Sequence, residues 1–332
     1  MSRLKLLTSS LSLLALALAS MGIYSACATT STHGLSTLRT TGPCTLFPPD
    51  NWWRQDISKL PVHPMSAKYV DSIGPAKGLH PDFGTVWNGA PNGIPFRVVS
   101  ARTPRVKIVF TRYGNESDPG PYPMPLDSPI EGGPKGTADR HVIAFDPGAC
   151  KLYEIFKAYP KKDHWEARSG AIWDLRSNKL RPLGFTSADA AGLPIYPGLV
   201  RYEEVMSGEI KHALRFTVER SQRAFIIPAT HWASDNTDES LPPMGLRFRL
   251  KASFDISGFS KTNQVILRAL KKYGMFMADN GGDWFLSGAP NPKWNDDDLH
   301  QLKLKVHGSD FEAVKTGPTE TRVPSLDDFN AP

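Results

Sequence analysis

The chain has 332 residues and a mass of 36.6 kDa, which allows one large domain or two small ones. It contains 40% hydrophobic and 22% charged residues, a composition typical of a globular protein. Its 29 prolines stand well above the usual share of about 5%, and each interior proline interrupts a helix. This composition therefore excludes a disordered chain, collagen, a coiled coil, a mostly helical protein and a protein with many membrane spans.

The formal net charge is +6, and the sequence contains no run of five or more basic residues. Nucleic-acid-binding proteins usually concentrate lysine and arginine in such runs or on one face. The charge pattern therefore argues against a nucleic-acid partner.

Residues 1–28 have the features of an export signal. Arg3 and Lys5 provide the positive start, residues 11–21 are apolar, and residues 26–28 (ACA) offer small side chains before a cleavage site. The apolar stretch is shorter than the roughly 20 residues that a membrane-spanning helix needs. We therefore predict an exported protein of the periplasm, the outer envelope or the extracellular space.

Cys27 leaves two alternatives for the mature amino terminus. Serine and alanine at positions 25 and 26 are the small residues that precede a lipidated cysteine, although Tyr24 stands where leucine is usual. The mature chain is thus expected to begin at Thr29 or to carry a lipid on Cys27. A lipid anchor would be its only contact with a membrane.

Three cysteines are present, and loss or lipidation of Cys27 leaves Cys44 and Cys150. An exported protein matures in a compartment that permits disulfides. We predict a Cys44–Cys150 disulfide, and the alternative is two buried free thiols.

After the export signal, the chain divides into three segments of different composition. Residues 29–43 are small and polar and are expected to form a tether. One β-rich globular domain is predicted over 44–316, with a long loop at 113–136, and a flexible polar tail over 317–332.

Apolar and polar residues alternate with period two in several segments, as in β-strands. Residues 141–146 and 151–159 lie close enough to form a hairpin. Residues 245–256 form the longest candidate, with Arg247, Arg249 and Lys251 on its solvated face. The predicted strands are 141–146, 151–159, 170–175, 209–218, 224–227 and 245–256.

A single clear helix is predicted over residues 263–274, with Thr262 as its cap and Gly274 at its end. Residues 275–288 are expected to form strand, tight turn and strand. The predicted fold is mainly β: a single β-sandwich or jelly-roll-like domain with one or two covering helices.

Several motifs of known chemistry are missing from the sequence. It contains no GxSxG, HExxH, CxxC, Walker A or GxGxxG pattern, and its nine histidines show no ligand spacing. Residues 279–283 (DNGGD) lack the alternating oxygen ligands and closing glutamate of a calcium loop, so a turn is favoured. We therefore predict neither a metal site nor a cofactor.

Asp189 and His212 are the strongest candidate catalytic residues. Asp189 lies among side chains too small to cover it, although it could simply cap a turn. His212 lies on an apolar strand face, where it is either an acid–base group or a core histidine. We predict that both line one wall of a sugar-binding cleft. Arg215 points the other way in a regular strand and joins them only across a bulge.

Three further carboxylates are candidate catalytic groups. Asp139 precedes a predicted strand, Glu154 lies within one, and Asp174 follows the tryptophan of a third. Burial of Glu154 would raise its pKa towards that of a general acid, whereas exposure at a sheet edge would leave it inert.

Eight tryptophans are present, and many adjoin aspartate, asparagine or histidine. Aromatic faces stack on sugar rings while neighbouring polar groups bond hydroxyls, although core packing explains tryptophan equally well. We expect Trp173, Trp232 and Arg215 to bind substrate, and the partner to be a polysaccharide or other glycan.

The stretches FPPDNWW, HPDFG, SADAAGLPIYPGLVRYEEV and KASFDISGF resemble a family of exported bacterial proteins to which no activity can be assigned. The resemblance covers about residues 47–315 and implies one domain, without an activity, cofactor or site. We expect a carbohydrate-active protein that cleaves cell-wall or environmental polysaccharide by hydrolysis or elimination, with Asp, Glu and His as acid–base groups. The alternative is a non-catalytic envelope protein that binds a glycan or a protein.

Overall fold

The computed structural model describes residues 44–321. Strand exceeds helix, 25% against 17%, so the prediction of a mainly β protein is confirmed. The predicted export signal, the tether up to residue 43 and Cys27 lie outside the described residues.

A mixed six-stranded sheet has the order β1-β14-β11-β13-β12-β15. The pairs β1–β14 and β11–β13 are parallel, and the other neighbouring pairs are antiparallel. Its strands are β1 (His80–Asp82), β11 (Leu214–Val218), β12 (Arg247–Leu250), β13 (Met275–Asn280), β14 (Phe285–Ser287) and β15 (Phe311–Val314).

Residues 275–288 form strand, turn and strand as predicted, namely β13 and β14, but these strands do not pair as a hairpin because β11 lies between them. Leu214, Phe216 and Val218 of β11 are completely buried, and Arg215 is nearly so. A strand that is buried on both faces gains most from a position with neighbours on either side. The short turn between β13 and β14 therefore spans one intervening strand.

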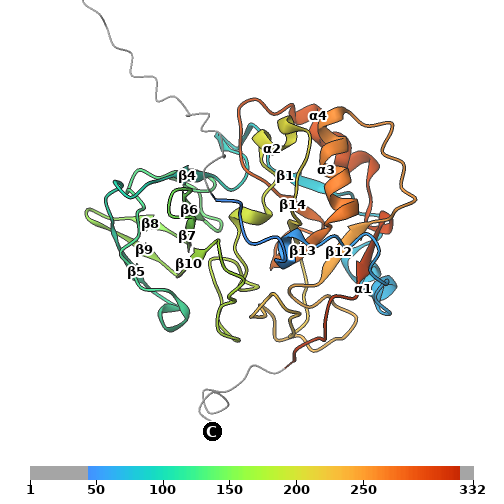
Figure 1. Ribbon diagram of the computed structural model, residues 1–332, viewed down its shortest axis with the longest axis horizontal. Coiled ribbons are helices and arrows are strands. Elements are labelled where there is room, and N and C mark those ends of the chain that lie inside the picture. Colours follow the sequence, from blue (N-terminus) through green and yellow to red (C-terminus); the bar gives the residue numbers. More distant parts are fainter. Residues whose placement is uncertain (1–43, 322–332) are drawn as a thin grey trace, which may run out of the picture. The chain divides into compact units, whose positions relative to one another are not determined.

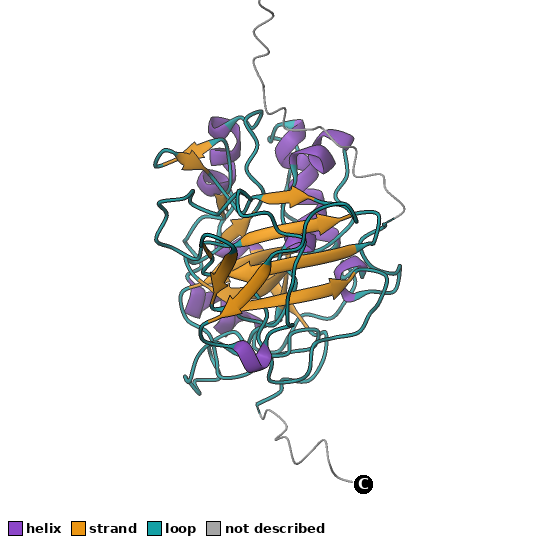
Figure 2. Ribbon diagram, turned by 90° about the vertical axis from the view of Figure 1, so that its left-hand side faces the viewer, coloured by secondary structure: helices purple, strands orange, loops and turns teal. Residues whose placement is uncertain are grey.

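A four-stranded sheet of order β10-β7-β6-β4 lies beside a three-stranded sheet of order β5-β9-β8 (Figures 1 and 2). The predicted hairpin is confirmed, since β6 and β7 pair antiparallel with Val142 opposite Ile155. The strands are β4 (Phe96–Val98), β6 (Val142–Asp146), β7 (Lys151–Phe156), β10 (Ser169–Asp174), β5 (Lys107–Phe110), β8 (Tyr159–Pro160) and β9 (His164–Ala167), with a separate pair, β2 (Val86–Trp87) and β3 (Ala90–Pro91).

The two faces of the four-stranded sheet serve two hydrophobic clusters. Ile143 and Phe145 of β6 belong to the larger cluster, whereas Val142 and Ala144 belong to a smaller one with Trp165 of β9. Strand period two explains this division, because successive side chains point to opposite faces.

Four α-helices occur in the described part of the chain, more than the one or two predicted. They are α1 (Ser66–Ile73), α2 (Tyr202–Ser207), α3 (Lys261–Lys272) and α4 (Asp296–Lys305), and the 3-10 helices are η1 (Trp52–Arg54), η2 (Gly114–Glu116), η3 (Tyr196–Gly198) and η4 (Gly308–Asp310). In Figure 1, α2, α3 and α4 lie near the strands of the six-stranded sheet and away from the four-stranded and three-stranded sheets.

The predicted helix exists as α3, but its cap is Ser260 rather than Thr262. The Ser260 side chain accepts a hydrogen bond from the Asn263 amide, which an N-cap residue does. Lys271 and Lys272 lie in the last turn of the helix, where their positive charges interact favourably with the negative end of the helix dipole.

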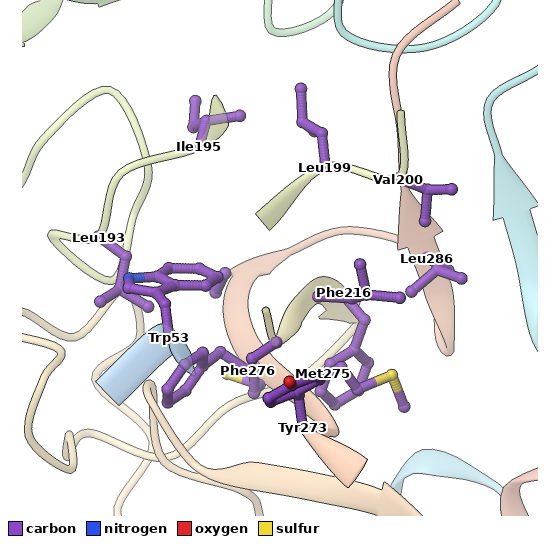
Figure 3. Packing of buried hydrophobic residues seen from close by; sticks show 14 of the residues in the cluster. Trp53, Leu193, Ile195, Leu199, Val200, Phe216, Tyr273, Met275, Phe276 and Leu286 are labelled. Atoms are coloured by element: carbon purple, nitrogen blue, oxygen red, sulfur yellow. The ribbon is translucent and has the colours of Figure 1, made fainter. Parts of the chain in front are cut away.

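The larger core joins the six-stranded sheet to the segment over residues 193–200 (Figure 3). Trp53 of η1 packs edge-on against Phe276 of β13, with ring centroids 4.8 Å apart. Leu193, Ile195 and Leu199 bring the irregular segment into this same core. The segment therefore has a fixed position although it has little regular structure.

The expected solvated row on residues 247–251 is also wrong for its two arginines. Arg247 is fully buried and donates to the carbonyl oxygens of Trp52 and Tyr273. Arg249 forms an ion pair with Glu312 at 2.8 Å. The chain around residues 52–60 covers this face, and its carbonyl groups satisfy the guanidinium donors.

The predicted Cys44–Cys150 disulfide is confirmed, with the two Cα atoms 5.1 Å apart. It is compatible with a protein that matures outside the cytoplasm. Over residues 44–321 we find no helix that is long and apolar enough to cross a membrane.

The first residues of the predicted tail, 317–321, are tied to the rest of the fold. Glu320 and Phe225 exchange two backbone hydrogen bonds, at 2.7 and 3.0 Å. The part of the predicted tail beyond residue 321 lies outside the described residues.

Candidate functional site

The loop that carries Asp189 connects β10 to η3 and is held by its own polar groups. The Ser187 hydroxyl accepts from the Asp189 amide at 2.9 Å and lies 2.6 Å from the Leu193 carbonyl oxygen, to which it donates. Gly192 has a φ of +71°, and a Cβ there would lie 2.1 Å from Oγ1 of Thr230. The loop thus depends on a residue without a side chain at its closest approach to the chain at residue 230.

The Asp189 carboxylate forms a buried ion pair with Arg215. Nη2 of Arg215 lies 2.8 Å from Oδ1, Nε lies 3.3 Å from Oδ2, and Nη1 donates to the Ser287 hydroxyl at 2.7 Å. The Asp189 side chain is 0% exposed and that of Arg215 is 3% exposed. A bidentate contact of this kind fixes both planar groups in one orientation.

A bulge in β13 brings Asp279 to the same place. Phe216 pairs with Met277, but Thr217 pairs with Asp279, so Ala278 is an extra residue. Because side chains alternate along a strand, the extra residue moves Asp279 onto the sheet face that carries Arg215. The freed carbonyl of Ala278 accepts from the Ala191 amide at 3.0 Å and ties the Asp189 loop to the bulge.

Asp279 is the carboxyl group of this cluster that solvent can reach. Its side chain is 19% exposed, and its Oδ2 lies 3.9 Å from Nη2 of Arg215. Burial raises the pKa of Asp279 well above its usual 3.8, the negative charge of Asp189 raises it further, and Arg215 offsets this only in part. Asp279 therefore keeps a proton at neutral pH and can donate it.

The cluster lies against a cavity of about 400 Å³. Within residues 44–321, no lysine or arginine lines this cavity. The aromatic, imidazole, carboxyl and amide side chains of its lining are those of Tyr113, Asp139, Phe156, Asp189, His231, Trp232, Asp235, Asp279 and Asn280.

His231 is a candidate functional residue that the sequence interpretation missed. Its Nδ1 lies 2.8 Å from the carbonyl oxygen of Ala190, so Nδ1 carries a proton and donates. In the neutral ring this leaves Nε2 with a free lone pair in the cavity wall, as a general base requires. One signal in the sequence points to His231: it directly precedes Trp232, which is predicted to bind substrate.

A second histidine, His141, holds the Asp189 loop in place through a hydrogen bond to Ala188. The ring of His141 bonds Glu131 through Nδ1 at 2.7 Å and the Ala188 carbonyl oxygen through Nε2 at 3.0 Å. Burial alone would lower the pKa of His141, but the Glu131 carboxylate outweighs it and raises the pKa to about 9. The protonated ring donates on both sides and fixes the residue that precedes Asp189.

Four of the predicted site residues come together. Asp139, Asp189 and Trp232 line the cavity, and Arg215 contacts Asp189. The bulge lies in the neighbouring strand β13 and not between His212 and Arg215, so the predicted condition for these two residues to share one site is not met.

His212 does not share this site, so the predicted common wall with Asp189 is wrong. The strand β11 begins only at Leu214, and His212 lies in the preceding loop. Its Nε2 lies 3.1 Å from both Arg201 and Glu204, and it lines a separate cavity.

Glu154 is fully buried, and its carboxylate accepts from the amides of Ile195 and Tyr196 and from the indole of Trp173. Burial raises the pKa of Glu154 to about 7 against the opposing effect of these donors. Its contacts hold η3 on β7, and Trp173 is thereby placed in the core rather than beside Trp232.

Asp174 is exposed and accepts from the Arg176 amide at 3.0 Å, which is an Asx turn rather than a site. In the described part of the chain, no group of three or more histidine, cysteine or acidic side chains could hold a metal ion.

Comparison of the chain with protein-family models, with curated proteins and with solved structures finds no match. The resemblance to exported bacterial proteins therefore stays a prediction, and the function has to be argued from the site itself.

Proposed function

We propose that the protein is an exported enzyme that hydrolyses a glycan of the cell wall or the surroundings at the Asp279 cavity. The observation that carries the proposal is the solvent-accessible carboxyl group of Asp279, whose pKa is raised, next to an inaccessible Asp189 that shares the Arg215 guanidinium. Pairs of titratable groups with such divergent environments are typical of acid–base sites.

The roles follow from access. Asp279 donates its proton to the oxygen of the glycosidic bond as that bond breaks. Nε2 of His231 takes a proton from the water that attacks the sugar carbon. Asp189 is too buried to touch substrate, so its role is to hold Arg215 and to raise the pKa of Asp279.

Hydrolysis is favoured over elimination by the charge of the cavity. Elimination from an acidic sugar needs a cation that neutralises the sugar carboxylate. The described lining offers four aspartates and no lysine or arginine, which favours a neutral or cationic glycan. Trp232 offers an aromatic face for a sugar ring beside these polar groups.

Asp279→Asn is the decisive variant. A neutral amide replaces a neutral carboxyl group of the same shape, so the melting temperature should hardly change at neutral pH. Turnover should fall by about 10²-fold or more, the lower range for a lost general acid. Release of reducing ends from peptidoglycan, chitin and neutral and acidic polysaccharides measures it, with the exposed Asp297→Asn as matched control.

Full activity of Asp279→Asn would contradict the assignment. If no glycan is cleaved but one binds with an affinity that Asp279→Asn leaves intact, the non-catalytic envelope protein becomes the better account.

We also propose a sandwich-like relation between the three-stranded and four-stranded sheets. The support is the smaller cluster, to which β6, β7 and β9 contribute Val142, Tyr153, Ile155 and Trp165. Face-to-face sheets share a core of this kind between alternate residues of facing strands.

A further inference from the structure

A second cavity, of about 450 Å³, lies around His212 and is separate from the Asp279 cavity. The two cavities have no lining residue in common. Its lining comprises Cys44, Thr45, Leu46, Arg54, Phe145, Tyr196, Arg201, Glu204, Ser207, Glu209, Lys211 and His212. The walls are thus partly aromatic and aliphatic and partly charged.

One buried polar atom of this wall has no partner. The Tyr196 hydroxyl forms no hydrogen bond with any described residue, although the side chain is 0% exposed. The ring itself is well held, since it stacks on Phe145 at 4.8 Å and lies under the Arg201 guanidinium at 4.6 Å. Buried hydroxyls are almost always hydrogen-bonded, so this one points to an additional polar group in the cavity.

Nε2 of His212 lies within hydrogen-bond distance of both a donor and an acceptor. Its Nδ1 lies 2.7 Å from the Ala213 carbonyl oxygen and donates there. Its Nε2 lies 3.1 Å from Nη2 of Arg201, a donor, and 3.1 Å from Oε2 of Glu204, an acceptor. A neutral ring satisfies Arg201 and a protonated ring satisfies Glu204, so neither state satisfies both.

The charges around His212 favour an anion. Arg201 and Glu204 form an ion pair at 2.6 Å and neutralise each other; burial would raise the pKa of Glu204, but Arg201 and His212 lower it to about 2. Lys211 lies 3.4 Å from Glu209 at the exposed rim. This leaves Arg54 as the uncompensated cation of the lining.

We propose that this cavity binds a small organic anion, a carboxylate or phosphate on an apolar body, with the Tyr196 hydroxyl donating to the anion and Arg54 contributing its positive charge. The apolar body would lie against Leu46 and Phe145. The proposal does not depend on the glycan-hydrolase assignment, because it concerns a different cavity.

Calorimetric titration with phenylacetate at pH 7.5, where this carboxylate is ionised, tests the proposal. We expect phenylacetate to bind. Phenyl phosphate is the second arm and decides between carboxylate and phosphate. Benzyl alcohol, of similar shape without charge, should not bind.

Two variants assign the site. Tyr196→Phe keeps the stacked ring and removes the unpartnered hydroxyl, so it should not lower the melting temperature, yet it should weaken phenylacetate binding about tenfold. Tyr122→Phe removes a buried hydroxyl elsewhere, which donates to Asp118, and should leave binding unchanged.

Three results would overturn the proposal: no binding of either anion, equal binding of benzyl alcohol, or anion binding that Tyr196→Phe leaves intact.

Discussion

The Asp189–Arg215 pair shows how a buried ion pair can serve a neighbouring group. Both side chains are inaccessible, and burial of two charges costs free energy that their contact only partly returns. Such a pair is weak evidence for stability. Its effect on Asp279 is direct, because a negative charge beside a buried carboxyl group favours the protonated form of that group.

Asp189→Asn should therefore have two measurable effects. It leaves the Arg215 charge without its partner, so the free energy of unfolding should fall by about 3–5 kcal/mol. It also removes the negative charge that raises the pKa of Asp279. The alkaline limb of kcat/KM, where Asp279 loses its proton, should shift to lower pH in a pH–rate profile of the folded variant.

The double variant Asp189→Asn, Arg215→Met provides the control, since it removes both charges. It should recover part of the lost stability, whereas the alkaline limb should stay at higher pH than in Asp189→Asn, because Arg215 no longer favours ionised Asp279. An alkaline limb that does not move in Asp189→Asn would contradict the proposed coupling between the two carboxyl groups.

At the scale of single residues, sequence reasoning could find Asp189 but not its neighbours Asp279 and His231. Small residues around Asp189 predicted an uncovered carboxylate, whereas the structure covers it with Arg215. The sequence predicts a turn at Asp279, because no local sequence pattern predicts a β-bulge. His231 depends on a backbone carbonyl of a loop 41 residues away, which a sequence pattern cannot show.

At the scale of elements, the site exists because one loop and one bulge are tied together. The Asp189 loop contributes the Ala191 amide, the bulge contributes the Ala278 carbonyl, and Gly192 lets the chain pass Thr230. Each contact pairs a backbone group that a regular strand would otherwise have paired. The irregular geometry is thus satisfied internally.

Gly192→Ala tests whether this loop geometry is required. The added Cβ would meet Oγ1 of Thr230 at 2.1 Å and the Phe185 carbonyl oxygen at 2.7 Å, with φ at +71°. Overpacking of about 1–3 kcal/mol and a left-handed backbone of about 1–2 kcal/mol should together lower the free energy of unfolding by roughly 2–5 kcal/mol. Denaturant unfolding measures it.

Gly208→Ala is the matched control, because its φ is +92° and no atom lies within 4 Å of the added Cβ. It carries the backbone cost alone, about 1–2 kcal/mol. Equal losses in the two variants would show that the contact with Thr230 is not what confines the loop.

The strands and helices differ in how strongly the local sequence predicts them. The β6–β7 hairpin and α3 have strong local signals, namely a short turn between apolar runs and a long apolar stripe. In α4 only Leu299 and Leu302 are buried, so its periodicity is weak despite three aspartates in the first turn. The position of β11 between β13 and β14 results from pairing over long sequence distances, which period-two patterns do not encode.

At the scale of the whole molecule, the segment over residues 184–200 connects the two largest sheets. Glu154 of β7 accepts the amides of Ile195 and Tyr196, and Asp189 binds Arg215 of β11. Displacement of the four-stranded sheet would therefore be transmitted to the Asp279 cavity through this segment. The Cys44–Cys150 disulfide ties Cys44 to the turn between β6 and β7 of the four-stranded sheet.

Reduction of this disulfide should destabilise the whole molecule. The bond joins residues 106 positions apart, and a closed loop of that length is worth about 4–5 kcal/mol in the chain-entropy model. Urea unfolding with and without dithiothreitol should show that loss, together with a larger m-value because the reduced unfolded chain is more expanded. The Cys44→Ala, Cys150→Ala variant should unfold like the reduced protein and should not respond to dithiothreitol. A loss below about 1 kcal/mol would mean that the bond adds little to what the apolar contacts of the 44–53 segment already provide.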